Sequence, residues 1–84
     1  MHTHLIRKQL ITLRNGKLTT IGLEPEFFRA LRLIAYSRSL TAADLIRNVE
    51  AQPRPWKQTL TSTLRCFVVR EMMAAYEAQF GHWR

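Results

Sequence analysis

The acidic residues are the first candidates for chemistry, because paired carboxylates can act as general acid and base or hold a divalent metal. The chain has six of them: Glu24, Glu26, Asp44, Glu50, Glu71 and Glu77. Glu24 and Glu26 flank Pro25 at a predicted helix start, where negative charge is favourable. Asp44 stands three residues after Thr41 in a capping pattern, and the other acids lie at helix-surface spacing. Each acid therefore has a structural explanation, and no pair of them indicates a catalytic centre.

The remaining reactive side chains do not form a site either. Cys66 is the only cysteine, and no histidine or acid lies close to it in sequence to activate its thiol, so we expect a small buried residue. His2 and His4 stand near a terminus and are not expected to bind a metal. Three glycines are too few for a glycine-rich phosphate loop. The sequence predicts no enzyme activity, no metal and no cofactor.

A strong positive charge points to a polyanionic partner instead. The chain of 84 residues carries 13 Lys and Arg against six acids, which gives a formal net charge of +7. The basic residues are spread along the chain, and this favours a folded basic surface over a disordered basic tail. Nucleic acid is the first partner class to consider, and an anionic membrane surface is the second.

Composition also bears on the compartment and the oligomeric state. Arg7, Lys8 and Arg14 interrupt the N-terminal segment, and no apolar run approaches the roughly 20 residues of a membrane span, so we expect neither a signal peptide nor membrane insertion. A single cysteine fits a reducing cytoplasm. Hydrophobic residues make up 46% of the chain, more than a small monomer buries easily, and this predicts an oligomer.

A hairpin over residues 5–23 is predicted to position the basic N-terminal residues. Asn15 and Gly16 tolerate positive φ and separate two apolar runs, which is a strong hairpin signal. A two-residue turn would divide the apolar side chains between the two faces, whereas a three-residue loop over residues 14–16 gathers them on one face. We predict the three-residue loop. The inward side chains are then Ile11, Leu13, Thr19, Ile21 and Leu23, and the outward ones on the second strand are Leu18, Thr20 and Gly22.

Three helices are predicted after the hairpin. The first covers residues 25–38 and starts at Pro25; the second covers residues 42–52, capped by Thr41; the third covers residues 60–79, capped by Thr59. The apolar stripe of the first helix is Phe27, Leu31, Ile34 and Ala35, widened by Phe28 and Leu33. That of the third is Leu60, Leu64, Phe67, Val68, Met72 and Ala75.

Two prolines separate the second helix from the third. Pro53 and Pro55 prevent the helix from continuing. The loop between the helices mixes Arg54 and Lys57 with Trp56, a combination that suits contact with nucleic acid. We expect instead that Trp56 folds over the core and that the two cations stay in solvent.

One copy of this arrangement leaves a strand edge open, and a two-fold partner supplying the same strand antiparallel would close it. With this feature the sequence resembles the ribbon-helix-helix proteins, and more narrowly a small bacterial family of ribbon-helix-helix domains. The resemblance rests on "LEPEFFRAL", "SLTAADLI" and "LTSTLRCFVV", and it extends over residues 12–70. These stretches are fairly specific together, whereas either of the two longer ones alone is a weak signal.

The resemblance implies a single domain over residues 1–84 that is mainly α with a short β-ribbon. The expected molecule is a ribbon-helix-helix homodimer with an N-terminal hairpin and three helices in each copy. It is expected to act as a bacterial, cytoplasmic transcription regulator whose ribbon lies in the major groove of double-stranded DNA.

The resemblance also implies a set of DNA-binding residues. The base-facing side chains would be those of Leu18, Thr20 and Gly22. Backbone N–H groups of Leu40 and Thr41 would hold a phosphate at a helix start, strengthened by Arg38. On the hairpin, Arg14 and Lys17 accompany Thr20 and are expected to contact phosphates.

The outward residues depart from the usual pattern of a ribbon that reads bases. Thr20 is the only hydrogen-bonding side chain among them, and Leu18 offers no more than contact with a thymine methyl group. Four strands at about 4.8 Å spacing also approach or exceed the roughly 12 Å width of the groove. Either the N-terminal strand lies off the groove, or the ribbon reads DNA weakly, or the surface has another use.

The alternative function is therefore a dimeric protein-interaction module, antitoxin-like or an adaptor. In this hypothesis the third helix and the C-terminal tail bind a protein partner, with Phe80 and Trp83 as anchors.

Overall fold

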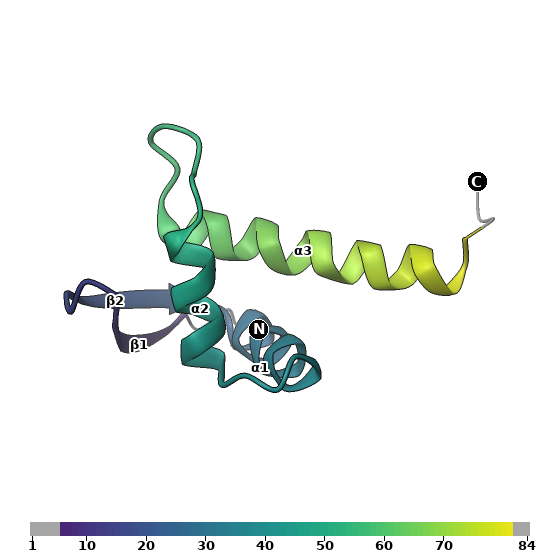
Figure 1. The fold of residues 1–84 in the computed structure, drawn as a ribbon, viewed down its shortest axis with the longest axis horizontal. Helices are drawn as coiled ribbons and strands as arrows, with labels where there is room; N and C mark the ends of the chain where they lie inside the picture. Colours follow the sequence, from purple (N-terminus) through teal and green to yellow (C-terminus); the bar gives the residue numbers. More distant parts are fainter. Residues whose placement is uncertain (1–5, 82–84) are drawn as a thin grey trace.

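The protein folds as an N-terminal hairpin followed by three helices, as the sequence predicts (Figure 1). The computed structural model describes residues 6–81; Leu5, the N-terminal histidines and Trp83 lie outside this range. The elements are β1 (Arg7–Thr12), β2 (Leu18–Leu23), α1 (Pro25–Ser37), α2 (Ala42–Ala51) and α3 (Leu60–Gln79).

The hairpin has the predicted three-residue loop. The N–H of Leu13 donates to the carbonyl of Lys17 at 2.8 Å, and Gly16 has a φ of +85°. The N–H of Gly16 donates to the carbonyl of Leu13 at 2.9 Å. This bond closes the turn, and Gly16 supplies the left-handed residue that a three-residue hairpin loop requires. In this register Ile11 pairs with Thr19, so the apolar side chains of both strands share one face.

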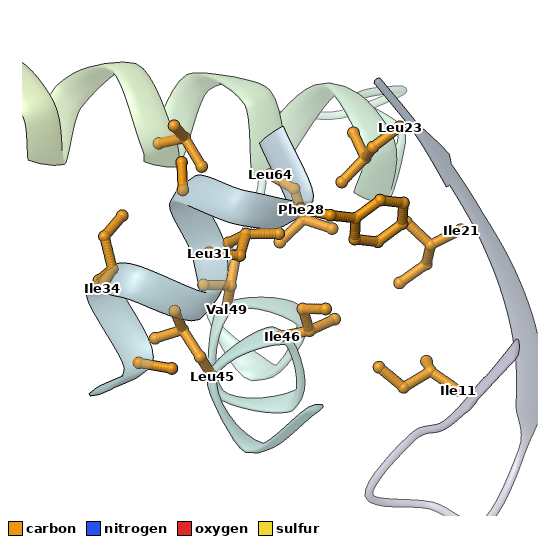
Figure 2. Packing of buried hydrophobic residues seen from close by; sticks show 13 residues of the cluster. Ile11, Ile21, Leu23, Phe28, Leu31, Ile34, Leu45, Ile46, Val49 and Leu64 are labelled. Atoms are coloured by element: carbon orange, nitrogen blue, oxygen red, sulfur yellow. The ribbon is translucent and has the colours of Figure 1, made fainter. Parts of the chain in front are cut away.

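That face and the three helices enclose the core. Figure 2 shows Ile11 and Ile21 of the hairpin on one side of the core and Leu31 of α1 on the other, with Ile46 of α2 and Leu64 of α3 completing it. The largest fully buried side chains are Ile21, Leu23, Leu31, Leu45, Ile46 and Leu64. Burying each such side chain contributes about 1.5–3 kcal/mol, so these few residues carry much of the stability of a small domain.

The turn between α1 and α2 is set by hydrogen bonds of its own backbone. Ser39 takes a left-handed conformation with φ of 58°, and its N–H donates to the carbonyl of Tyr36 at 3.1 Å. The N–H of Leu40 donates to the carbonyl of Ala35 at 2.9 Å, which completes a Schellman motif. The side chain of Thr41 then caps α2 by accepting from the N–H of Asp44 at 3.1 Å, as predicted.

Helix α3 begins after the predicted cap Thr59, but its C-terminal half extends past the other elements (Figure 1). Leu64 and Val68 are buried as predicted, whereas Met72 and Ala75 of the same predicted stripe are exposed. Their prediction as core residues is wrong because no other described element reaches this part of α3. Leu33 of α1 is likewise exposed, although it was expected to widen the buried stripe.

Two further expectations about burial are wrong. Cys66 is exposed, because it lies on the side of α3 opposite to the buried Leu64 and Val68; its sulfur is 3.9 Å from the Gln58 side-chain nitrogen. Trp56 is 85% exposed and does not fold over the core. It stands in the loop that projects between α2 and α3 in Figure 1.

Candidate nucleic-acid interface

The outer face of the hairpin is the face turned away from the helices, where the predicted base-facing residues lie. Leu18 and Thr20 are exposed there. Gly22 is half-buried, because Ile6 lies over it: a Cβ at this position would be 3.1 Å from the Cγ2 of Ile6. A Cβ at this position would therefore require the Ile6 side chain to shift by a few tenths of an ångström.

This outer face is more apolar than the second strand alone indicates. Strand alternation adds the side chains that point outward from β1, and the outer face then consists of Ile6, Lys8, Leu10, Thr12, Leu18, Thr20 and Gly22. Leu10 is 62% exposed and Leu18 is 59% exposed. The face can thus offer methyl groups over much of its area, with hydroxyls at Thr12 and Thr20 and an ammonium group at Lys8.

The edge of β2 that does not face β1 is open. Hydrogen-bonded and non-hydrogen-bonded pairs alternate along an antiparallel ladder, and Leu13 with Lys17 is a hydrogen-bonded pair. The backbone N–H and C=O groups of Leu18, Thr20 and Gly22 consequently point away from β1. They are the groups with which another strand could pair.

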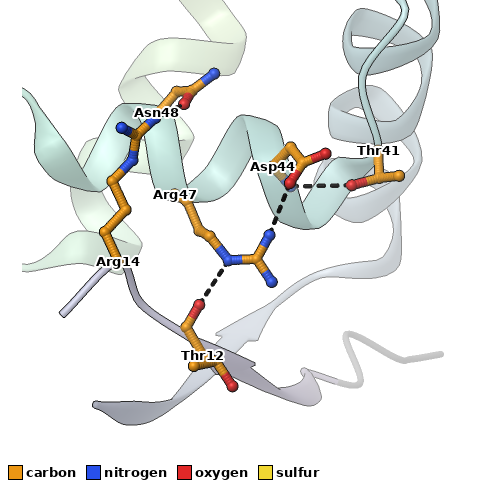
Figure 3. Close-up of polar contacts among 6 residues, drawn as sticks. All are labelled: Thr12, Arg14, Thr41, Asp44, Arg47 and Asn48. Carbon is orange, nitrogen blue, oxygen red and sulfur yellow. Dashed lines mark hydrogen bonds and ion pairs between the residues drawn. The ribbon is translucent and has the colours of Figure 1, made fainter. Parts of the chain in front are cut away.

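The opposite edge of the hairpin is partly covered by α2 (Figure 3). The Arg47 Nε donates to the carbonyl oxygen of Thr12 at 2.7 Å, and its guanidinium also pairs with Asp44 at 2.8 Å. Nearby, the guanidinium of Arg14 in the hairpin loop donates to the side-chain oxygen of Asn48. These contacts hold the hairpin against α2 and leave β2 as the more accessible edge.

The hairpin concentrates positive charge. Its cations are Arg7, Lys8, Arg14 and Lys17, and residues 6–23 contain no acid. No ion pair of these four is found within residues 6–81, whereas three cations elsewhere pair with acids: Arg38 with Glu71, Arg47 with Asp44 and Arg65 with Glu24. Net positive charge at the hairpin therefore remains available to an external anion.

A shallow hollow next to the hairpin adds a cation that the sequence prediction did not include. It lies between β1 and the start of α1 and is lined by Arg7, Lys8, Gln9, Pro25, Phe28 and Arg32. Arg32 and Arg7 are 25 residues apart in sequence, so only the packing of α1 against the hairpin brings them together. A phosphate group in this hollow would lie close to the cationic residues Arg7 and Arg32.

The predicted phosphate site at the start of α2 is changed in two respects. The N–H of Leu40 is already used by the carbonyl of Ala35, which leaves the N–H groups of Thr41, Ala42 and Ala43 without an acceptor inside the helix. The Arg38 side chain turns toward α3, where it pairs with Glu71 and lies 5.6 Å from the centre of the Phe67 ring. Arg38 thus stabilises the packing of α3 rather than extending toward the start of α2.

The loop between α2 and α3 presents an aromatic ring with a cation. Lys57 lies with its ammonium 4.5 Å from the centre of the exposed Trp56 ring. Such a pair is suited to stacking on a base or contacting a phosphate. The mixture of cations and an aromatic residue in this loop already indicated a possible contact with nucleic acid in the sequence. The loop was not predicted as part of the interface because Trp56 was expected to be buried.

Residues 6–81 contain neither a metal site nor a membrane span. No cluster of three or more histidine, cysteine or acidic side chains there could hold a metal ion. No helix in that range is long and apolar enough to cross a membrane.

Comparison with known proteins gives one match. The model of the family described as "Ribbon-helix-helix domain" matches residues 6–72. This range contains the hairpin, α1, α2 and most of α3. No curated protein and no solved structure matches the chain significantly.

Proposed function

The chain belongs to the ribbon-helix-helix domain family, and from this membership we propose that it is a DNA-binding transcription regulator that acts as a homodimer. Families of this kind generally consist of DNA-binding regulators. The observation that carries the proposal is the open edge of β2, with the unpaired N–H and C=O groups of Leu18, Thr20 and Gly22, on the most cationic part of the chain.

In the proposed dimer, β2 pairs antiparallel with β2 of a second copy. This pairing satisfies the open backbone groups, which otherwise form a template for uncontrolled association. Two observations support β2 rather than β1 as the paired strand. Arg47 occupies the carbonyl of Thr12 on the β1 edge, and β2 leads directly into α1, so the pair would also bring the two helical layers together.

The resulting sheet has four strands in the order β1, β2, β2 and β1. At about 4.8 Å per strand the two β1 strands lie roughly 14 Å apart, a little more than the roughly 12 Å width of the major groove. We infer that the β2 strands enter the groove while the β1 strands lie along its rims. Lys8 and Arg7 on β1 would then be near the phosphates that border the groove.

The chemistry of the outer face determines what such a ribbon could recognise. The Thr20 hydroxyl can donate to or accept from a base edge, and Leu18 can contact a thymine methyl group. Lys17, Arg14 and the N–H groups at the start of α2 would contact phosphates and set the orientation on the duplex. We therefore expect modest discrimination among sequences, with preference for thymine where Leu18 lies.

Selection of binding sequences from a random pool of duplexes tests this function. The proposal expects enriched sequences that are inverted repeats, because a two-fold protein reads two equivalent half-sites. Thr20→Ala should relax the preference at a symmetric pair of positions and leave the preference elsewhere unchanged. Enrichment of sequences without any two-fold symmetry would contradict the homodimeric ribbon.

The protein-interaction module remains the second candidate function. The observation that favours it is the exposed apolar surface on the C-terminal half of α3, which includes Tyr76 and Phe80. If a different protein binds there, removal of residues 76–84 should abolish its binding and leave the ribbon dimer folded. The charges on α3, however, fit a second copy of this chain.

A further inference from the structure

The exposed half of α3 carries a seam of large apolar side chains. Val69, Met73 and Tyr76 of α3 and the C-cap residue Phe80 follow one another at intervals of four, three and four residues, which is the d-a-d-a spacing of a coiled-coil heptad. Their exposed fractions lie between 46% and 61%. The Tyr76 and Phe80 rings are in contact, with centres 4.7 Å apart. No other described element packs on this seam, so the fold of one copy leaves it in solvent.

Two opposite charges flank the seam on the same side. In the heptad set by these residues, Arg70 and Glu77 both occupy position e, since they are seven residues apart. Neither side chain has an ion-pair partner within residues 6–81. The other α3 acid, Glu71, lies on a different side of the helix and is paired with Arg38.

We propose that this half of α3 pairs antiparallel with the same segment of a second copy of the chain. In an antiparallel pair position d of one helix meets position a of the other, so Val69 lies opposite Phe80 of the second copy and Met73 lies opposite Tyr76. The two-fold axis repeats both contacts, which gives four apolar layers. The same alignment brings Arg70 beside Glu77 of the second copy, and again the axis makes this contact twice.

The charges distinguish this arrangement from a parallel one. In a parallel pair, position g of one helix lies beside the following position e of the other. Arg65 is at such a g position, so it would lie beside Arg70 of the second copy, and the like charges would repel. Arg65 is instead paired with Glu24 in its own chain at 3.0 Å. Of the two directions, only the antiparallel one therefore places an acid, Glu77, beside Arg70.

The proposal assigns the chain a second self-complementary surface, separate from the β2 edge. It does not depend on DNA binding, because the seam lies on the part of α3 that projects past the hairpin, α1 and α2 (Figure 1). Self-complementarity also argues for a second copy as the occupant, since an unrelated protein would not require Arg70 and Glu77 in this symmetric relation.

A charge swap in the full-length protein tests the proposal by sedimentation equilibrium. Arg70→Glu and Glu77→Arg should each weaken self-association about tenfold, because two attractive pairs become two repulsive ones. The double variant carrying both changes should return to the wild-type association constant. An equimolar mixture of the two single variants should also recover, since each provides the charges that the other lacks.

Two further variants are controls. One tests whether a change of charge elsewhere affects self-association, and the other tests whether the effect depends on pairing of the β2 strands. Arg54→Glu makes the same change of charge in the loop before α3 and should leave self-association unchanged. Thr20→Pro removes a backbone donor from the open edge of β2, and the charge-swap pattern should persist in this background. Circular dichroism should show intact helices throughout, because the altered side chains are exposed or lie on the surface.

The pattern of association decides the outcome. The proposal is supported if each single variant weakens self-association and the double variant restores it, whether or not Thr20→Pro removes a separate ribbon contact. It is overturned if Arg70→Glu associates as tightly as the wild type, or if the double variant stays weak. Either result would show that α3 does not pair with itself in this register.

Discussion

The Arg47 Nε in α2 lies 2.7 Å from the carbonyl oxygen of Thr12 at the end of β1, and this contact distinguishes the two edges of the hairpin. Thr12 belongs to a non-hydrogen-bonded pair with Leu18, so its carbonyl points away from β2. Arg47 covers that carbonyl from outside. The matching groups on the β2 edge have no such cover, and this asymmetry is the structural basis for assigning β2 as the strand that pairs with a second copy.

Replacing Arg47 by methionine should loosen the hairpin from α2. The variant keeps most of the apolar stem but loses the hydrogen bond to Thr12 and the pair with Asp44, so we expect the free energy of unfolding to fall by about 1–2 kcal/mol. Urea denaturation followed by circular dichroism measures this. Asp44→Asn is the matched control, because it keeps the bond to Thr12 and should cost less than about 1 kcal/mol. Equal losses in the two variants would mean that the Thr12 contact contributes nothing.

Gly16→Ala should destabilise the hairpin loop. Gly16 has a φ of +85° and open space around its Cα, so the effect of a Cβ is conformational strain and not a clash. We expect a loss of about 1–2 kcal/mol in the free energy of unfolding, seen as a lower thermal midpoint. Gly16→Asn should lose less, because asparagine tolerates the left-handed region. If alanine and asparagine behave alike, the assigned loop geometry is incorrect.

Ile21→Asp and Thr20→Ala test which face of β2 is inward. Ile21 is 1% exposed, and an aspartate there would bury a charge without a partner, so this variant should fail to fold. Thr20→Ala changes an exposed residue and should alter the free energy of unfolding by less than about 0.5 kcal/mol while lowering DNA affinity. Comparing the unfolding curves of both variants with that of the wild type gives the answer. If the two variants are equally stable, the assignment of Ile21 to the inner face and Thr20 to the outer face is wrong.

Lys17→Gln should weaken DNA binding without changing its sequence preference. In the proposed dimer the substitution removes two cations that would lie near phosphates, so the slope of log affinity against log salt should become shallower by about 2. Anisotropy titrations at several salt concentrations provide the slope. Lys57→Gln in the loop between α2 and α3 is a comparison. A similar change in the salt slope for this variant would mean that the DNA-binding surface extends to Trp56. An unchanged slope would mean that the surface is confined to the hairpin.

Much of the fold could be predicted from local patterns. The three-residue loop follows from the requirement that Ile11 and Ile21 share a face, and the caps Thr41 and Thr59 mark the starts of α2 and α3. These predictions succeed because backbone conformation and the two faces of a strand depend on neighbouring residues. They need no knowledge of distant contacts.

The errors concern what covers a helix face. Periodicity places Met72 on the same stripe as Leu64, but it does not reveal that the C-terminal half of α3 extends past α1 and α2 (Figure 1), and Met72 is exposed. Likewise, Arg38 precedes the start of α2 in sequence, yet its ion pair with Glu71 arises from packing across 33 residues. The approach of Arg32 to the hairpin is a tertiary contact of the same kind, and no local pattern encodes it.

Fluorescence anisotropy against random-sequence duplex DNA at several salt concentrations tests whether a homodimer binds DNA through the ribbon. Light scattering on the same samples gives the mass. We expect a species of at least two copies that neutralises roughly 6–10 phosphates, so its affinity should fall about 10³–10⁵-fold between roughly 50 and 200 mM salt. A dimer that fails to bind DNA even at low salt would show that the ribbon is not a DNA-binding surface and would leave a protein as the partner.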